Sequence, residues 1–203
     1  MVNKNDKTYW AKKWTKKTDA PNSFARRALT LIRKKKLQTL LDLGSGDGRD
    51  SLYFANKGLT VYALDFSKSG ITMLKKKNPA IKAFLGDIKK LPFKKNSFDV
   101  IYAHLSLHYF TDSETKKIFA RLHGILKKDG LLFVKRKSIH DPLFGRGKKI
   151  KENMYRSGHT RHFFSIDYMQ AQLKKFKVIK IAKTSSIYAG FKSAFIEATA
   201  IKV

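Results

Sequence analysis

The feature that most constrains the fold is the regular alternation of short apolar runs with helical patterns along the first two thirds of the chain. Short runs ended by glycine or a capping residue are typical of buried strands, and apolar residues three and four positions apart are typical of helices. Such alternation predicts parallel strands joined by right-handed crossovers, with helices on both faces of one sheet. The expected order is helix 24–36, strand 37–44, helix 50–58, strand 60–66, helix 68–77, strand 81–87, strand 98–107, helix 113–130 and strand 131–138.

The alternation breaks after residue 137. Residues 138–164 have no clear period and are long for a structureless loop, so we interpret them as a lid or substrate loop. A helix at about 165–175 precedes two strand patterns, 176–184 and 193–203, which we expect to pair as an antiparallel hairpin at the sheet edge. The sequence therefore predicts an α/β fold in one domain, 1–203. It would have a doubly wound, mostly parallel seven-stranded sheet, an antiparallel C-terminal hairpin and an N-terminal cap segment, 1–23.

Composition excludes several kinds of chemistry. The 203 residues contain no cysteine, which removes disulfides, thiolate metal sites and cysteine nucleophiles. No apolar run could span a membrane or serve as a secretory signal, so we expect a cytoplasmic protein with no membrane partner. The net charge of +29 reflects either a general compositional bias or a surface that binds polyanions. Lysine clusters that are scattered, as here, predict non-specific attraction.

Three glycines follow the first expected strand, in the stretch LLDLGSGDGRDS, at Gly44, Gly46 and Gly48. A P-loop needs Lys and Ser or Thr after its last glycine, where this chain has Arg49 and Asp50. A dinucleotide fingerprint needs a third glycine at the position that Arg49 occupies. Both phosphate-binding interpretations therefore fail. A further alternative is that the glycines only permit a tight strand-to-helix turn.

Acidic residues are few in this chain, and several fall at expected strand ends. Asp42 and Asp47 flank the glycine turn and would repel a pyrophosphate by Coulomb's law. The turn therefore suits a ligand with a positive centre and free hydroxyls. Asp99, at the start of the fourth expected strand, is interpreted as structural.

The stretch LLDLGSGDGRDSLYFANKG resembles the first motif of the class I, seven-stranded S-adenosylmethionine-dependent methyltransferases, which have a Rossmann-like fold. The likeness continues through VYALDFS, GDIKKLPF, FDVIYAHLSLHYF and LHGILKKDGLLFV, over roughly residues 38–136. It implies direct in-line transfer of a methyl group, with S-adenosylmethionine as cofactor and S-adenosylhomocysteine as product. One departure is Asp129, which stands where the family more often has proline.

The same resemblance implies the cofactor contacts. Asp65 would hold both ribose hydroxyls, Asp87 would accept from the adenine amine, and the Ile88 backbone N–H would meet a ring nitrogen. Asp65 could instead cap the next helix, and Asp87 could be a solvated loop carboxylate. The full cofactor-binding set is Asp42, Gly44, Ser45, Gly46, Asp65, Phe66, Asp87, Ile88 and His104.

The acceptor side is expected after the fourth strand and in 138–164. His108 is the candidate general base, which a hydroxyl or protonated amine acceptor needs and a thiolate or tellurite-like acceptor does not. YWAKKW, GDGRDSLYFANKG and RHFFS resemble small-molecule methyltransferases of the tellurite-resistance and thiopurine type, whose N-terminal segment covers the cofactor. Candidate substrate residues are Trp10, Trp14, Tyr155, Arg161 and His162. The tryptophans could only anchor a helix, and the histidines could be ordinary surface residues. No metal site is expected.

A small-molecule acceptor, whether a thiol, a metalloid or an N or O nucleophile, is the favoured substrate. The alternative is an RNA methyltransferase that uses the basic surface to bind the polyanion. Cytosine C5 chemistry is excluded because it needs a cysteine. The adenine-N6 enzymes of the family carry an Asn/Asp-Pro-Pro-aromatic motif where this chain has AHLSLHY. A protein acceptor and a non-catalytic cofactor-binding protein stay open.

Overall fold

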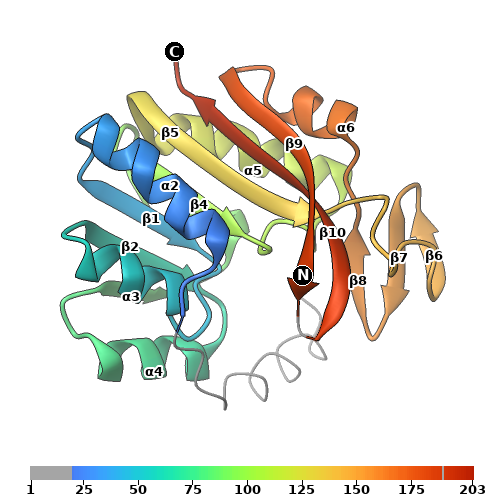
Figure 1. Cartoon of the computed structure of the whole chain (residues 1–203), viewed down its shortest axis with the longest axis horizontal. Coiled ribbons are helices and arrows are strands. Elements are labelled where there is room, and N and C mark those ends of the chain that lie inside the picture. Colours follow the sequence, from blue (N-terminus) through green and yellow to red (C-terminus); the bar gives the residue numbers. More distant parts are fainter. Residues whose placement is uncertain (1–19, 189) are drawn as a thin grey trace.

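The computed structural model describes residues 20–188 and 190–203, which are built around one seven-stranded sheet (Figure 1). The strands are β1 (Thr39–Leu43), β2 (Thr60–Asp65), β3 (Lys82–Leu85), β4 (Phe98–His104), β5 (Leu126–Lys137), β9 (Lys177–Tyr188) and β10 (Phe191–Ile201). Their order is β3-β2-β1-β4-β5-β10-β9, in which β10 pairs antiparallel with both β5 and β9 and the other pairs are parallel. This confirms the predicted Rossmann-like sheet with its C-terminal hairpin. The strand order reverses between β1 and β4, beside the glycine turn.

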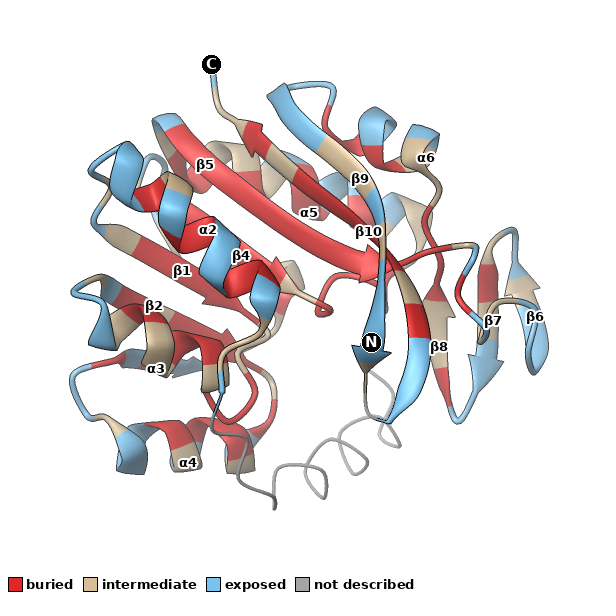
Figure 2. Ribbon diagram, in the orientation of Figure 1, coloured by how far each residue is buried: buried red, intermediate tan, exposed pale blue. Residues whose placement is uncertain are grey.

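Helices cover both faces of the sheet. The helices α2 (Ser23–Lys34), α3 (Arg49–Asn56) and α4 (Lys68–Lys77) bury one apolar core against it. A short 3-10 helix, η1 (Ile88–Lys90), and the helices α5 (Asp112–Ile125) and α6 (Ile166–Gln172) bury the other. Figure 2 shows β5 buried along most of its length between the two layers, as expected for a central strand covered on both faces.

The boundary between α5 and β5 differs from the prediction. The helix ends at Ile125 and the strand begins at Leu126, whereas the helical pattern suggested a helix to residue 130. Leu126 pairs with Phe98 in the sheet, and this tertiary contact overrides the local preference for helix. The chain then bulges before Leu131, and a Cβ on Gly130 would lie 2.9 Å from the Asp99 carbonyl oxygen.

Asp99 has the structural role that the sequence predicts. Its carboxylate accepts hydrogen bonds from the backbone N–H groups of Gln38 (3.2 Å) and Thr39 (2.8 Å). It also accepts one from Lys127 Nζ at 2.8 Å. These bonds tie the start of β1 to the start of β4 and to the bulge in β5.

A second, three-stranded antiparallel sheet lies within residues 138–164, a segment whose sequence has no clear period. Its strands are β6 (Lys148–Lys151), β7 (Met154–Ser157) and β8 (His159–His162), and their order is β6-β7-β8. Each strand has only four residues, and many of the side chains are charged. The alternation of apolar and polar residues that marks a strand is therefore too short to recognise in the sequence. The segment stays attached to β5, because Ser138 bridges to Phe164 and the Phe164 N–H donates to the Lys137 carbonyl at 2.8 Å.

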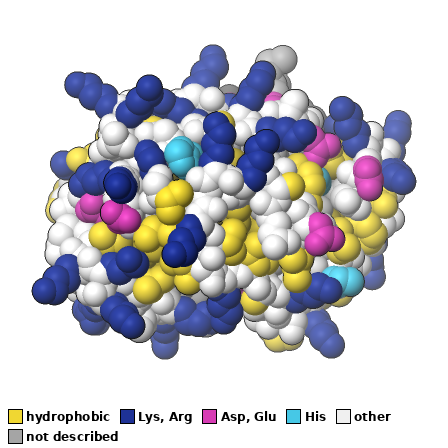
Figure 3. Space-filling model, turned by 90° about the horizontal axis from the view of Figure 1, so that it is seen from above, with side chains coloured by type: hydrophobic (Ala, Val, Ile, Leu, Met, Phe, Trp, Pro, Cys, Tyr) yellow, Lys and Arg dark blue, Asp and Glu magenta, His cyan; other side chains and the backbone are white. Residues whose placement is uncertain are grey.

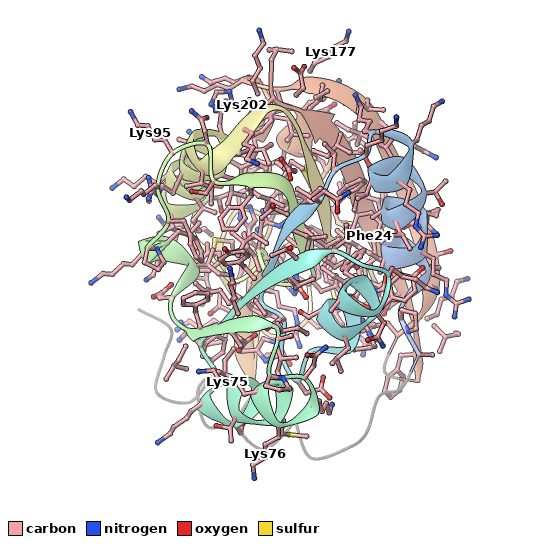
Figure 4. The ribbon with its side chains drawn as sticks, turned by 90° about the vertical axis from the view of Figure 1, so that its left-hand side faces the viewer. Phe24, Lys75, Lys76, Lys95, Lys177 and Lys202 are labelled. Atoms are coloured by element: carbon pink, nitrogen blue, oxygen red, sulfur yellow. The ribbon has the colours of Figure 1, made fainter. Side chains whose placement is uncertain are left out.

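Basic side chains are spread over the surface of the described residues. They project on all sides of the face shown in Figure 3. In Figure 4, Lys75, Lys76, Lys95 and Lys177 point outward from different parts of the chain. Within the described ranges, no helix has the length and apolar content needed to cross a membrane.

Candidate functional site

The glycine turn joins β1 to α3 at the edge where the strand order reverses. Gly44, Gly46 and Gly48 have φ angles of 75°, 58° and 91°, which side chains other than glycine rarely adopt. A Cβ on Gly44 would lie 2.3 Å from Ser106 Cβ, and one on Gly48 would lie 2.2 Å from Leu74 Cδ1. The turn therefore packs against the segment that follows β4 and against α4, and glycine is required for both contacts.

The N–H groups of this turn are already used within the protein. Those of Gly44 and Ser45 donate to the Leu64 carbonyl at 2.7 and 3.3 Å, and that of Gly46 donates to the Asp65 carboxylate at 2.9 Å. A phosphate cradle instead points its N–H groups at the ligand. The geometry thus agrees with the exclusion of a P-loop.

Asp65 is the last residue of β2 and is 5% exposed. One carboxylate oxygen accepts the Gly46 N–H, and the other accepts the Ser67 N–H at 2.7 Å. Burial raises the pKa of Asp65, and hydrogen bonds from the backbone N–H groups of Ser67, Gly46 and Phe66 oppose the increase. The side-chain cap of α4 is Ser67, which accepts from the Gly70 N–H, so Asp65 is not that cap. Phe66, the residue that follows Asp65, is half-buried.

A buried carboxyl cluster lies beneath the turn. Asp42 is 3% exposed and accepts a 2.6 Å hydrogen bond from Ser51 Oγ. Burial, and then the nearby Asp50, raises the pKa of Asp42 to about 7. Asp50 accepts from the Tyr102 hydroxyl at 3.1 Å and from the Asn22 N–H at 3.2 Å. Sequence reasoning placed Asp42 here and missed Asp50, Tyr102 and Asn22.

The remaining candidate cofactor residues lie at the carboxyl ends of neighbouring strands. Asp87 caps η1 by accepting the Lys89 N–H at 2.9 Å, and Ile88 is buried in the core that α5 covers. His104 ends β4, half-buried, with its ring parallel to that of Tyr102 at 6.4 Å. Burial lowers the pKa of His104 to about 3, so its imidazole is neutral.

His108 lies in the segment after β4, which begins with Leu105 in the left-handed region (φ 56°). His108 is 2% exposed, and its Nδ1 has no hydrogen-bond partner within the described residues. Burial, and then the positive charge of Arg136, holds the pKa of His108 well below its ordinary value. A histidine in these surroundings is a weak base. The backbone N–H of His162 donates to the His108 carbonyl at 2.8 Å, which joins this segment to β8.

The three described members of the candidate substrate set lie on two faces of the small sheet. Tyr155 on β7 and Arg161 on β8 are cross-strand partners on one face. The Tyr155 ring packs against Phe144 and Phe163, with centroids 5.1 and 6.2 Å apart. His162 points from the other face, and burial lowers its pKa to about 4.

Trp10 and Trp14 lie outside the described residues. The described end of the expected N-terminal cap segment includes Asn22, whose side chain accepts the Ala25 N–H at 2.9 Å and caps α2. The same asparagine donates to Asp50, so this end of the segment meets the carboxyl cluster.

Comparisons with known proteins agree with this geometry. Residues 41–134 match the methyltransferase domain family. A demethylmenaquinone methyltransferase from Renibacterium salmoninarum is 37% identical over 108 residues, which are 53% of this chain and 44% of that protein. Among solved structures, a SAM-dependent methyltransferase from Methanosarcina mazei has a TM-score of 0.76 at 20% identity, over 85% of this chain and 97% of that one. TehB from Haemophilus influenzae has a TM-score of 0.74 at 18% identity, over 97% of this chain and 67% of that one.

Residues 41–134 therefore match a methyltransferase domain, and the sheet has the fold of S-adenosylmethionine-dependent methyltransferases. The likeness to the tellurite-resistance type is one of fold, as the identity to TehB is low. The chain spans less than half the length of three curated relatives that it matches.

Proposed function

We propose that this protein transfers the methyl group of S-adenosylmethionine to a small-molecule acceptor. The observation that carries the proposal is the pairing of an internally bonded glycine turn with the buried carboxyl Asp42 beneath it. The neighbouring Asp50 is already ion-paired with Arg49, whose Nε lies 3.1 Å away. Such a turn suits a cationic ligand and disfavours a phosphate. S-adenosylmethionine supplies a methyl group on a positively charged sulfonium, and its methionine part carries an ammonium group.

The residues around the turn would hold the other parts of the cofactor. Asp65 is a buried carboxylate at the end of β2 beside the glycine turn, and this position supports its assignment to the ribose hydroxyls. Asp87 is partly exposed one strand further along, which suits the adenine amine. His104, being neutral, would face the methionine part without repelling its positive charge. Gly44, Ser45 and Gly46 would shape the floor of the site.

Catalysis would then consist of positioning. The activated methyl group requires only a nucleophile held in line in a closed, water-poor space. The segment after β4 and the strand β8 would enclose that space, with residues 138–164 acting as a lid. Because His108 is a weak base, the proposal favours an acceptor that needs no strong base, such as a thiolate, a metalloid oxyanion or an already ionised oxygen.

An RNA acceptor is the second candidate, and the net charge of +29 is the observation that favours it. The outward lysines in Figure 4 come from separate elements, which supports non-specific attraction over a dedicated groove. A dedicated groove would give RNA binding a steep dependence on salt concentration, and scattered lysines would give a shallow one.

The test is a radiolabel transfer assay with the methyl group of S-adenosylmethionine as label. The purified protein would be offered a small-molecule extract (below about 3 kDa) and, separately, total RNA, with Asp65→Ala as the control variant. Label in the small-molecule arm that depends on Asp65 would support the proposal. Label only in RNA would replace it with the second candidate.

A further inference from the structure

Arg136, near the end of β5, is a buried cation with unmet hydrogen-bonding capacity. Its exposure is 0%, and Nε, Nη1 and Nη2 all lack a hydrogen-bond partner within residues 20–188 and 190–203. One face of the guanidinium is covered, because Cζ lies 3.6 Å from the centre of the Phe164 ring. That contact is favourable but weaker than the cost of leaving a buried charge unpaired. Burial accordingly lowers the pKa of Arg136 well below its ordinary value.

The two neighbouring cations of the same strand show how this protein usually balances a buried charge. Lys135 Nζ lies 2.9 Å from Glu197, and Lys137 Nζ lies 2.7 Å from Asp141. Both lysines point to the opposite face of the sheet and are at most 6% exposed. Among these three buried cations of β5, Arg136 alone has no acidic partner within the described residues. A bound anion would supply the missing counter-charge.

Other polar groups cluster around Arg136. His108 has an unpartnered Nδ1, and the charge of Arg136 lowers the pKa of both His108 and His162. The Phe164 ring lies between Arg136 and His162, because it contacts the guanidinium at 3.6 Å and the His162 ring at 4.9 Å. His108 is joined to the same group by the hydrogen bond from the His162 N–H to its carbonyl. The cluster thus combines the guanidinium donors with a neutral imidazole in a space of positive potential.

The acidic side chain beside His162 is already engaged elsewhere. Asp112 accepts a 2.6 Å hydrogen bond from the Tyr168 hydroxyl and lies 3.5 Å from His162 Nε2. Its side chain is 49% exposed, and it makes no hydrogen bond to Arg136. Asp112 therefore leaves the guanidinium donors unsatisfied.

The cluster lies where an acceptor would meet the cofactor. Lys135 pairs with His104, the last residue of β4, so Arg136 stands one residue beyond that strand end. Phe164 follows β8 and donates its N–H to the Lys137 carbonyl. Figure 1 shows β5 ending where the chain leads into the small sheet. The guanidinium therefore lies between the carboxyl ends of β4 and β5 and the strand β8.

We propose that Arg136, together with the Nδ1–H of His108, binds an anionic group of the methyl acceptor, either a carboxylate or another oxyanion. The inference rests on the proposed function and narrows its substrate to acidic small molecules. A guanidinium presents two parallel N–H groups that match the two oxygens of a carboxylate. On this account His108 serves to bind and orient the acceptor.

The experiment uses the full chain saturated with S-adenosylhomocysteine. Two acids, acetate and benzoate, and their uncharged isosteres acetamide and benzamide would be titrated into wild-type protein, Arg136→Met and Arg136→Lys. The Arg136 Nε–H resonance and calorimetry would serve as readouts. We expect at least one acid to bind wild type at least about tenfold more tightly than its amide. We expect Arg136→Met to lose this preference and Arg136→Lys to retain part of it, because the ammonium keeps the charge without the fork.

Control measurements separate the possible failures. The exposed Arg26→Met on α2 removes the same charge and should bind the acids as wild type does. Arg136→Met should also melt at a higher temperature than wild type without added acid, because an apolar side chain replaces an unpaired cation. If neither acid is preferred by loaded wild-type protein, or if Arg136→Met melts lower, Arg136 is balanced within the chain and the inference is overturned. Absence of S-adenosylhomocysteine binding to wild type would instead contradict the proposed function.

Discussion

Replacing Asp42 by asparagine should stabilise the protein without its cofactor, and the gain should grow with pH. The pKa of Asp42 rises from 3.8 to about 7 in the folded protein. A carboxyl with a raised pKa contributes stability that is present below pH 4 and lost as pH rises through 7. A rise of three pKa units corresponds to about 4 kcal/mol of lost folding free energy once the carboxyl is ionised in both the folded and the unfolded protein. Asn keeps an oxygen that can accept the Ser51 hydrogen bond and has no charge to bury, so we expect Asp42→Asn to be about 2 to 4 kcal/mol more stable at pH 8.

Urea unfolding followed by circular dichroism at pH 5 and pH 8 would measure this difference. The gain should shrink to less than about 2 kcal/mol at pH 5, where wild-type Asp42 is protonated in the folded protein. Asp167→Asn, which removes an exposed carboxylate on α6, is the matched control and should change stability little at either pH. A variant no more stable than wild type at pH 8, with the same pH dependence, would refute the reasoning.

The same substitution connects stability to function. A buried carboxylate that destabilises the protein alone can be retained because a ligand compensates its charge. Asp42→Asn should therefore bind S-adenosylmethionine at least about tenfold more weakly even though the protein itself is more stable. Unchanged affinity would mean that Asp42 has no electrostatic part in cofactor binding.

Three further substitutions test the site. Asp65→Ala should weaken S-adenosylhomocysteine binding in calorimetry by about 1.5 to 3 kcal/mol, the worth of hydrogen bonds to a charged group, and unchanged affinity would contradict the ribose assignment. Gly44→Ala should be destabilised more than Gly58→Ala in urea unfolding, because both have positive φ but only the Cβ at residue 44 meets a neighbour; equal losses would show that the contact with Ser106 relaxes. His108→Gln should leave the pH dependence of kcat between pH 6 and 8 unchanged, since the pKa of His108 lies well below its ordinary value; loss of an inflection near pH 6.5 would identify a titrating base.

The sequence was sufficient for the succession of strands and helices along the chain because the signals for each element are local. Gly44, Asp65 and Ser67 each end or begin an element, and their types are dictated by the turn, strand end and cap that they form. Asp99 was correctly interpreted as structural, although its hydrogen bonds reach the distant residues Gln38, Thr39 and Lys127. The boundary at Leu126 was wrong because a pairing with Phe98, 28 residues away, decides it.

The missed residues depend on contacts between distant parts of the chain. Asp50 and Tyr102 are 52 positions apart and meet only because β1 and β4 are neighbours in the sheet. Arg136 lies in the expected strand 131–138 and was not singled out as a candidate site residue. The available signal was its position at the end of a central strand covered on both faces, where consecutive basic residues must be buried.

The most direct test of the central claim is calorimetric titration of wild-type protein with S-adenosylmethionine and, separately, with NAD. A cofactor site built from carboxylates and an internally bonded turn predicts saturable binding of S-adenosylmethionine and no binding of NAD. It also predicts that Asp65→Ala binds S-adenosylmethionine more weakly than wild type. Binding of NAD, or no binding of S-adenosylmethionine, would contradict the account of the glycine turn and of the carboxyl cluster beneath it.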